Sequence, residues 1–135
     1  MANATLLITG AAGFTGRHLI AAANAKGYRC IAVAQHAGSE VSGAHNTLVA
    51  DLLDPAALER TVAQAAPDYI VHLAAISFVA HGNTSEIYRV NQLGTINLLD
   101  AIQKSAPNIK KVLIASSANI YGNAAQLPIT EATPP

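Results

Sequence analysis

Short apolar runs recur along the chain and are separated by longer segments of mixed polarity. Glycine, proline or polar residues end each run, which is typical of strands that are buried on both faces of a sheet. We predict five such strands, over residues 4–9, 29–34, 47–50, 69–73 and 110–116.

The segments between these runs place apolar residues at helical spacing. We predict helices over residues 16–26, 54–66 and 86–105. Asp54-Pro55 supplies an N-cap followed by a proline in the first turn, and Gly27 and Pro107 stand where helices commonly end. Residues 35–46 are polar and contain glycine, so we predict a loop there.

Strands that alternate with helices favour an α/β fold, here a Rossmann-type, doubly wound parallel sheet with helices on both faces. Right-handed crossovers then predict the strand order 3-2-1-4-5. Ligands of such sheets bind beyond the carboxyl ends of the strands, where the strand order reverses. The candidate functional segments therefore follow Thr9, Leu73 and Ser116.

Glycines at regular spacing join the first predicted strand to the first predicted helix. They are Gly10, Gly13 and Gly16, in the stretch "TGAAGFTG". A helix N-terminus offers free N–H groups and a partial positive charge, which attract a diphosphate. Gly10 would allow the tight turn, Gly13 would let phosphates approach the backbone, and Gly16 would let the helix pack on the sheet. We predict a dinucleotide site; the alternative is a glycine turn that binds nothing.

Composition and charge narrow the possible functions. Hydrophobic residues make up 51% of the 135 residues and charged residues 12%, with a formal net charge of zero, which gives no case for a nucleic-acid or anionic membrane partner. A single cysteine, Cys30, excludes an internal disulfide framework, and the histidines are too dispersed for a local metal site. The longest apolar stretch, 69–80, is too short for a membrane span, and no secretory signal is present. We expect a cytoplasmic protein without a metal ion.

Thr9–Gly16 matches TGxxGFxG, the glycine motif of the extended short-chain dehydrogenase/reductase family, which comprises the NAD-dependent epimerases and dehydratases of nucleotide sugars. Later segments resemble this family in the same order and spacing: Asp51-Leu52, His72–Ala75 ("HLAA"), Val90–Ala101 ("VNQLGTINLLDA") and Ser116–Gly122 ("SSANIYG"). The resemblance implies that residues 1–135 form an N-terminal NAD(P)-binding Rossmann domain, incomplete because later strands and a substrate domain would follow.

The resemblance implies a set of cofactor-binding residues: Gly10, Gly13, Phe14, Thr15, Gly16, Asp51, Leu52, Leu73, Ala74, Ala75 and Asn91. Asp51 would contact the adenine, or it could instead cap the next helix, although Asp54 is better placed as that cap. Asn91 is mildly unfavourable within a helix, so we expect it to hold a water or backbone near the site. The alternative is a polar spot on a helix face.

Ser117 is the candidate catalytic residue, because it precedes Tyr121 as the family's catalytic Ser or Thr precedes its Tyr-Gly pair. The resemblance implies that Ser117 holds the reacting substrate oxygen; alternatively, it ties down a loop. Ser77, Phe78 and Asn119 are candidate substrate contacts, or merely structural loop residues.

The family's proton donor is the tyrosine of a Tyr-x-x-x-Lys motif. No tyrosine of this chain has a lysine four residues later: Tyr28, Tyr69, Tyr88, Tyr121. We expect that pair beyond Pro135, and therefore expect residues 1–135 alone to be inactive.

Three further residues invite a functional reading. His72, in a buried strand, is expected to be a core histidine whose hydrogen bonds are satisfied, and not a catalytic residue. Cys30 is expected to be inert. Arg17 could reach a phosphate or extend into water.

The segments "AAISFV" and "LGTINLLDAI" most resemble the GDP-sugar branch of the family, namely GDP-mannose 4,6-dehydratase and GDP-4-keto-6-deoxy-mannose reductase. The dehydratases carry an acidic residue where this chain has Asn119. An amide cannot serve as a general acid or base, so the reductase or epimerase reading is favoured over dehydration.

The end of the second predicted strand bears on the choice of cofactor. An NAD enzyme usually has an acidic residue there, whereas this chain has Ala34 and Gln35. No arginine is placed for a 2′-phosphate; only His36 and Ser39 are nearby. This favours NADP, with NAD not excluded.

Together these features predict an NAD(P)-dependent nucleotide-sugar oxidoreductase or epimerase. The alternatives are a dinucleotide-binding module without catalysis, or a family enzyme with a non-sugar hydroxy or keto substrate. The family's dimers are four-helix bundles, so the resemblance also implies a homodimer through helix 86–105.

Overall fold

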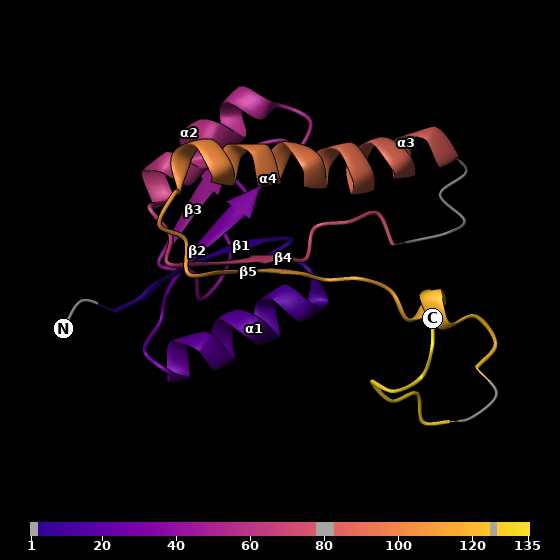
Figure 1. The fold of residues 1–135 in the computed structure, drawn as a ribbon. Helices are drawn as coiled ribbons and strands as arrows, with labels where there is room; N and C mark the ends of the chain where they lie inside the picture. Colours follow the sequence, from indigo (N-terminus) through magenta and orange to yellow (C-terminus); the bar gives the residue numbers. More distant parts are fainter. Residues whose placement is uncertain (1–2, 78–82, 125–126) are drawn as a thin grey trace.

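The computed structural model describes residues 3–77, 83–124 and 127–135. Five parallel strands form one sheet in the order β3-β2-β1-β4-β5. This confirms the predicted α/β class and strand order (Figure 1). The strands are β1 (Thr5–Thr9), β2 (Arg29–Ala34), β3 (Asn46–Val49), β4 (Tyr69–His72) and β5 (Lys111–Ile114).

Helices cover both faces of the sheet (Figure 1). One face carries α1 (Phe14–Ala25). The other carries α2 (Pro55–Ala65) and a long helical rod. The rod consists of α3 (Thr84–Tyr88), the π-helical turn η2 (Arg89–Leu93) and α4 (Gly94–Ser105).

The central strand β1 explains why its sequence is a continuous apolar run. Leu7 packs into the core beneath α2 and α4, whereas Leu6 and Ile8 pack into the core beneath α1. Successive side chains point to opposite faces of a strand, so a sheet covered on both sides needs apolar residues at every position.

The boundaries of the elements differ slightly from those expected. The rod begins at Thr84, two residues before the predicted Glu86, because the side chain of Asn83 accepts the N–H of Glu86 at 3.1 Å and caps it. Strand β5 ends at Ile114 and not at Ser116. The predicted cap of α2 is confirmed, since Asp54 Oδ1 accepts the N–H of Ala57 at 2.9 Å.

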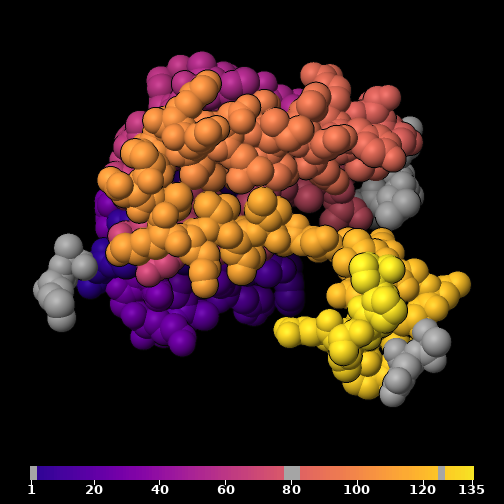
Figure 2. Space-filling view, viewed as in Figure 1, coloured from indigo at the N-terminus to yellow at the C-terminus, as the bar shows by residue number. Residues whose placement is uncertain are grey.

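The outer strand β5 is less buried than the other strands. Leu113 is 51% exposed and Ile114 is 44% exposed. A short 3₁₀ helix, Ala118–Tyr121, follows this strand. The C-terminal segment, yellow in Figures 1 and 2, lies to one side of the layers of sheet and helices. Within the described residues, no helix is long and apolar enough to cross a membrane.

Candidate functional site

Two pockets adjoin at the carboxyl ends of the strands and share Gly10, Gly13 and residues 74–76. The β2-side pocket has a volume of about 410 Å³ and reaches the ends of β2 and β3. The β5-side pocket, of about 780 Å³, reaches the segment after β5. Both lie where β1 neighbours β4, which is the place where the strand order reverses and where a ligand was predicted.

The two pockets bring together every described residue that the sequence analysis assigned to the site. Asp51 and Leu52 line the β2-side pocket. The β5-side pocket is lined by Phe14, Thr15, Gly16, Leu73, Ser77, Asn91, Ser117 and Asn119, while Ala74 and Ala75 belong to both. Phe78 lies outside the described residues. Arg17 lines neither pocket.

The three glycines of the turn differ in what surrounds them. Gly10 has φ +67°, and a Cβ there would lie 2.6 Å from the nitrogen of Ala74. A Cβ on Gly16 would lie 2.5 Å from the carbonyl oxygens of Gly10 and Ala11. The close contact of Gly16 is therefore with the turn, whereas contact with the sheet was expected. A Cβ on Gly13 would meet only the Gly10 oxygen, at 3.2 Å. Gly10 and Gly16 are thus required by the fold, whereas a Cβ on Gly13 would meet a single backbone atom.

The first turn of α1 is an electropositive end without a side-chain cap. Gly13 is its N-cap residue and offers no side chain, and the first turn contains no acidic residue. The N–H groups of a first helical turn lack intrahelical acceptors and carry partial positive charge. This donor set suits a diphosphate, which fits a dinucleotide.

Asp51 and Leu52 follow β3 and form one wall of the β2-side pocket. Asp51 was expected to have a free carboxylate. Its Oδ1 instead accepts the N–H of Leu53 at 2.8 Å. Leu52 is buried against Gly94, where an added Cβ would lie 2.9 Å from that of Leu52. The sequence did not identify Gly94 as the packing partner of Leu52. A glycine inside a predicted helix was the local signal for such a close contact.

The segment after β2 contributes Gln35, His36 and Ser39 to the β2-side pocket. All three are exposed, and none carries a carboxylate or a guanidinium group. These three residues therefore bring hydrogen-bonding groups without a negative charge, while the carboxylates that line this pocket belong to Asp51 and Glu86.

Asn91 lies in the π-helical turn and holds the segment that follows β4. Its Oδ1 accepts the N–H of Ile76 at 2.8 Å, and its Nδ2 donates to the Ile76 oxygen at 3.0 Å. This pair of bonds matches the expectation that Asn91 holds backbone. It fixes one edge of the wall that both pockets share.

His72 ends β4 and lines the β5-side pocket. Its Nδ1 lies 2.6 Å from Thr9 Oγ1, and its Nε2 lies 2.9 Å from Thr95 Oγ1. Both ring nitrogens are thus bonded, as expected for a satisfied core histidine. Burial lowers the pKa of His72 below its ordinary value of 6.5. No local pattern in the sequence marks Thr9 or Thr95 as a polar partner of this ring.

Ser117 also lines the β5-side pocket and is exposed. Its Oγ accepts the N–H of Asn119 at 3.2 Å and thereby caps the short helix Ala118–Tyr121. The hydroxyl proton of Ser117 remains available for another acceptor, because Oγ acts as an acceptor in this bond. Ser117 therefore ties down its loop and also presents a donor to the pocket.

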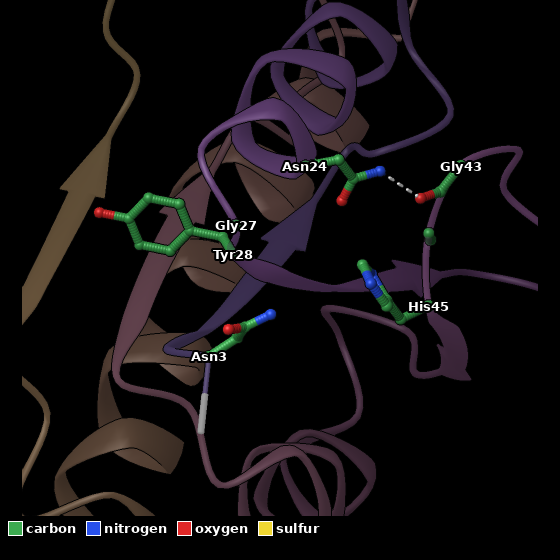
Figure 3. A pocket seen from close by; sticks show the side chains of 7 residues that line it. Asn3, Asn24, Gly27, Tyr28, Gly43 and His45 are labelled. Carbon is green, nitrogen blue, oxygen red and sulfur yellow. Dashed lines mark hydrogen bonds between the residues drawn. The ribbon is translucent and has the colours of Figure 1, made fainter. Parts of the chain in front are cut away.

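A third hollow, of about 340 Å³, lies at the opposite end of the sheet, among Asn3, Tyr28 and His45 (Figure 3). There Asn24 Nδ2 donates to the Gly43 oxygen at 2.8 Å, while Asn24 Oδ1 has no partner among the described residues. His45 Nδ1 accepts the N–H of Cys30 at 3.2 Å. This hollow contains none of the predicted site residues. Among the described residues, no group of three His, Cys, Asp or Glu is placed to hold a metal ion.

Two similar proteins are both named as enzymes that act on nucleotide sugars. GDP-6-deoxy-D-talose 4-dehydrogenase of Aggregatibacter actinomycetemcomitans is 37% identical over 119 residues, covering 87% of this chain and 36% of that protein. UDP-glucose 4-epimerase 2 of Oryza sativa subsp. japonica is 32% identical, covering 96% of this chain and 35% of that protein.

Solved structures agree with these relatives. A putative epimerase from Burkholderia cenocepacia J2315 superposes with a TM-score of 0.83 at 36% identity, covering 98% of this chain and 43% of that one. UDP-glucose 4-epimerase from Bifidobacterium longum, solved in complex with NAD+ and UDP, gives a TM-score of 0.81 at 33% identity, covering 96% and 42%.

This chain therefore spans well under half the length of the relatives it matches. The model of one family matches residues 6–135, which is nearly the whole chain. The chain belongs to the NAD dependent epimerase/dehydratase family.

Proposed function

We propose that this chain is the cofactor-binding part of an NAD(P)-dependent nucleotide-sugar oxidoreductase or epimerase. The observation that carries the proposal is the uncapped N-terminus of α1, which opens at Gly13 into two adjoining pockets. Such a helix end binds a diphosphate, and the pockets on either side offer room for the two nucleosides of a dinucleotide.

The residues divide between the two pockets by their chemistry. Residues 10–16 would hold the diphosphate, and Asp51 and Leu52 would contact the adenine. Asn91 would keep the wall at residues 74–76 in place. A bound dinucleotide would supply hydride transfer to or from the substrate.

The β5-side pocket would receive the sugar of the substrate. Ser117 would donate a hydrogen bond to the reacting oxygen, and Ser77, Phe78 and Asn119 would contact the sugar. Since Asn119 cannot act as a general acid, we propose oxidation and reduction at a sugar carbon without elimination of water.

Two of the relatives are named for chemistry at position 4 of a hexose, one as a GDP-sugar 4-dehydrogenase and one as a UDP-sugar 4-epimerase. These names support position 4 as the reacting carbon. The GDP-sugar relative supports a 4-keto reductase of GDP-sugars; the epimerases support a UDP-sugar in its place.

The dinucleotide site is tested by Gly13→Val, which places a branched side chain where the diphosphate would lie. The matched control is Ala22→Val, on the exposed face of the same helix. Calorimetric titration with NAD+ and NADP+ should show binding to the unchanged chain and to the control, and loss of binding in Gly13→Val. Equal affinities for all three chains would contradict the proposal.

The same titration decides between the two cofactors. Gln35, His36 and Ser39 lack a carboxylate that would repel a 2′-phosphate, which supports a preference for NADP(H). Relatives solved with NAD bound support NAD(H). Tighter binding of NADP+ is the result that we expect.

We propose, as well, that the helical rod mediates a homodimer. Apolar side chains remain exposed along it at Tyr88, Leu93, Ile96 and Leu99. An exposed apolar stripe of this kind favours association with a second copy.

A further inference from the structure

The imidazole of His72 connects three parts of the fold. It lies at the end of β4, is 3% exposed, and bridges Thr9 at the end of β1 and Thr95 in α4. Its position in the wall of the β5-side pocket means that its contacts lie directly beside the candidate site.

The hydrogen bonds around His72 fix which nitrogen carries its proton. Thr95 Oγ1 donates its only proton to the Asn91 oxygen at 2.7 Å, so it must accept from His72 Nε2. In the neutral ring Nδ1 then has no proton and accepts from Thr9 Oγ1. The Thr9 oxygen in turn accepts the N–H of Ala74 at 3.2 Å. Each donor in this series of hydrogen bonds therefore has one acceptor.

The chain of bonds reaches both ends of the wall that the two pockets share. Thr9 holds the N–H of Ala74 at one end. Asn91, whose own carbonyl oxygen receives the Thr95 proton, holds Ile76 at the other end. The ring of His72 is the link between these two anchors.

The shared wall is also packed tightly against the glycine turn. The Cα of Gly10 lies so near the backbone of Ala74 that a Cβ would be 2.6 Å from its nitrogen. A displacement of Ala74 would therefore be transmitted to the turn. An apolar residue at position 72 would fill the core but leave Thr9 and Thr95 without their shared partner.

We propose that His72 is a positioning residue, which, as the neutral Nε2–H tautomer, holds the wall at residues 74–76 in register with the glycine turn so that the pockets fit one dinucleotide. This inference rests on the proposed cofactor-binding function. His72 does not touch the reacting atoms in this proposal; it acts through Thr9, Thr95 and Asn91.

Substitutions that retain one half of the ring's hydrogen bonding, or none of it, test the proposal. His72→Gln can still donate toward Thr95, His72→Asn can still accept from Thr9, and His72→Leu can do neither. Ile70→Val is the control, because Ile70 lies in the same strand and is buried, but lines neither pocket. Its effect shows what a loss of stability alone does to binding.

The measured quantities are the dissociation constants for the dinucleotide that binds the unchanged chain and for ADP, together with the unfolding free energy in urea. We expect His72→Leu to weaken dinucleotide binding roughly tenfold or more, as for loss of two buried hydrogen bonds, and ADP binding much less. His72→Gln and His72→Asn should each bind the dinucleotide more tightly than His72→Leu, though less tightly than the unchanged chain. Ile70→Val should leave both constants unchanged.

Nitrogen NMR of the imidazole gives a readout that is independent of ligand. At neutral pH, His72 should show a protonated Nε2 and an unprotonated Nδ1. The opposite tautomer would overturn the proposal. So would a dinucleotide affinity of His72→Leu equal to that of Ile70→Val, even with the cofactor-binding function intact. Failure of the unchanged chain to bind either dinucleotide would overturn the proposed function, and this inference with it.

Discussion

The glycines of the turn illustrate how the same residue type serves two purposes. Gly10 and Gly16 leave no room for a Cβ because backbone atoms lie within 2.7 Å of where it would be, whereas a Cβ on Gly13 would meet only the Gly10 oxygen, at 3.2 Å. The sequence motif treats all three alike. Only the packing distinguishes glycines needed to fold from the one free for a ligand.

Gly16→Ala should therefore destabilise the fold. Its Cβ would lie 2.5 Å from two carbonyl oxygens that belong to the backbone and cannot turn away. We expect the unfolding free energy to fall by about 1–3 kcal/mol or more. Gly13→Ala should cost less than about 1 kcal/mol. Urea denaturation of both variants checks this, and equal losses would contradict it.

The buried ring of His72 makes stability depend on pH. Burial lowers its pKa from the ordinary 6.5, so the unfolded chain binds a proton more readily than the folded chain. Unfolding free energy should be highest above pH 6.5 and should fall as the pH drops from there to the lowered pKa of the folded protein. Asp68, whose pKa is lowered by its hydrogen bond to Lys110, stabilises the fold above its ordinary pKa of 3.8, and this contribution is lost only as the pH falls below that value.

Urea denaturation at pH 7.5 and 5.5 measures this dependence. In His72→Gln, which has no titrating ring, the difference between the two pH values should shrink. An unchanged difference would assign the pH dependence to other groups.

Among the elements, the helical rod departs most from its prediction. Apolar periodicity indicated a helix over 86–105, but it could not show the π-helical turn Arg89–Leu93. A π turn admits one extra residue per turn, which a pattern of 3.6 residues does not reveal within so few positions. The turn contains Asn91, so the irregular part of the rod is the part that faces the site.

The exposed stripe of the rod should be the surface through which two chains associate. Ile96→Lys and Leu99→Lys would place charges in that interface, so sedimentation velocity should shift from dimer toward monomer. Leu113→Lys, on the exposed outer strand, is the control. A monomer before substitution, or a dimer that only Leu113→Lys disrupts, would contradict this prediction.

The sequence alone was sufficient for the strands and their order, and it pointed to residues that line the two pockets. Buried parallel strands require continuous apolar runs, and the crossover rule then leaves few orders. Bonds between distant residues could not be predicted, since nothing in the local pattern links Thr9 to His72, 63 positions later. Nor could the sequence show whether the carboxylate of Asp51 bonds to the backbone of its own turn, as it does, or is left for a ligand.

At the scale of the whole molecule, the proposed chemistry is incomplete within these 135 residues. Reduction of a sugar ketone needs a proton for the forming alkoxide, and the hydroxyl of Ser117 is too weak an acid to supply it alone. No tyrosine here has a lysine four residues later. Loss of one acid or base group costs roughly 10²–10⁴-fold in rate.

We therefore expect this chain alone to show no detectable reduction of 4-keto nucleotide sugars by NADPH or NADH. A longer chain that includes a Tyr-x-x-x-Lys pair should be active. Loss of nicotinamide absorbance measures both. Robust turnover by the 135-residue chain that disappears in Ser117→Ala would show that the catalytic acid lies within it.

The central place of β1 has a consequence for how the chain folds during synthesis. Within this chain β1 precedes the other strands, yet it pairs with β2 on one side and with β4, some forty residues further along the chain than β2, on the other. Closing such long loops slows folding. The β1-α1-β2 unit can form early, but Ala74, the far wall of both pockets, arrives only with β4. During synthesis the two pockets should therefore form late, when β4 pairs with the β1 strand that is already folded against β2.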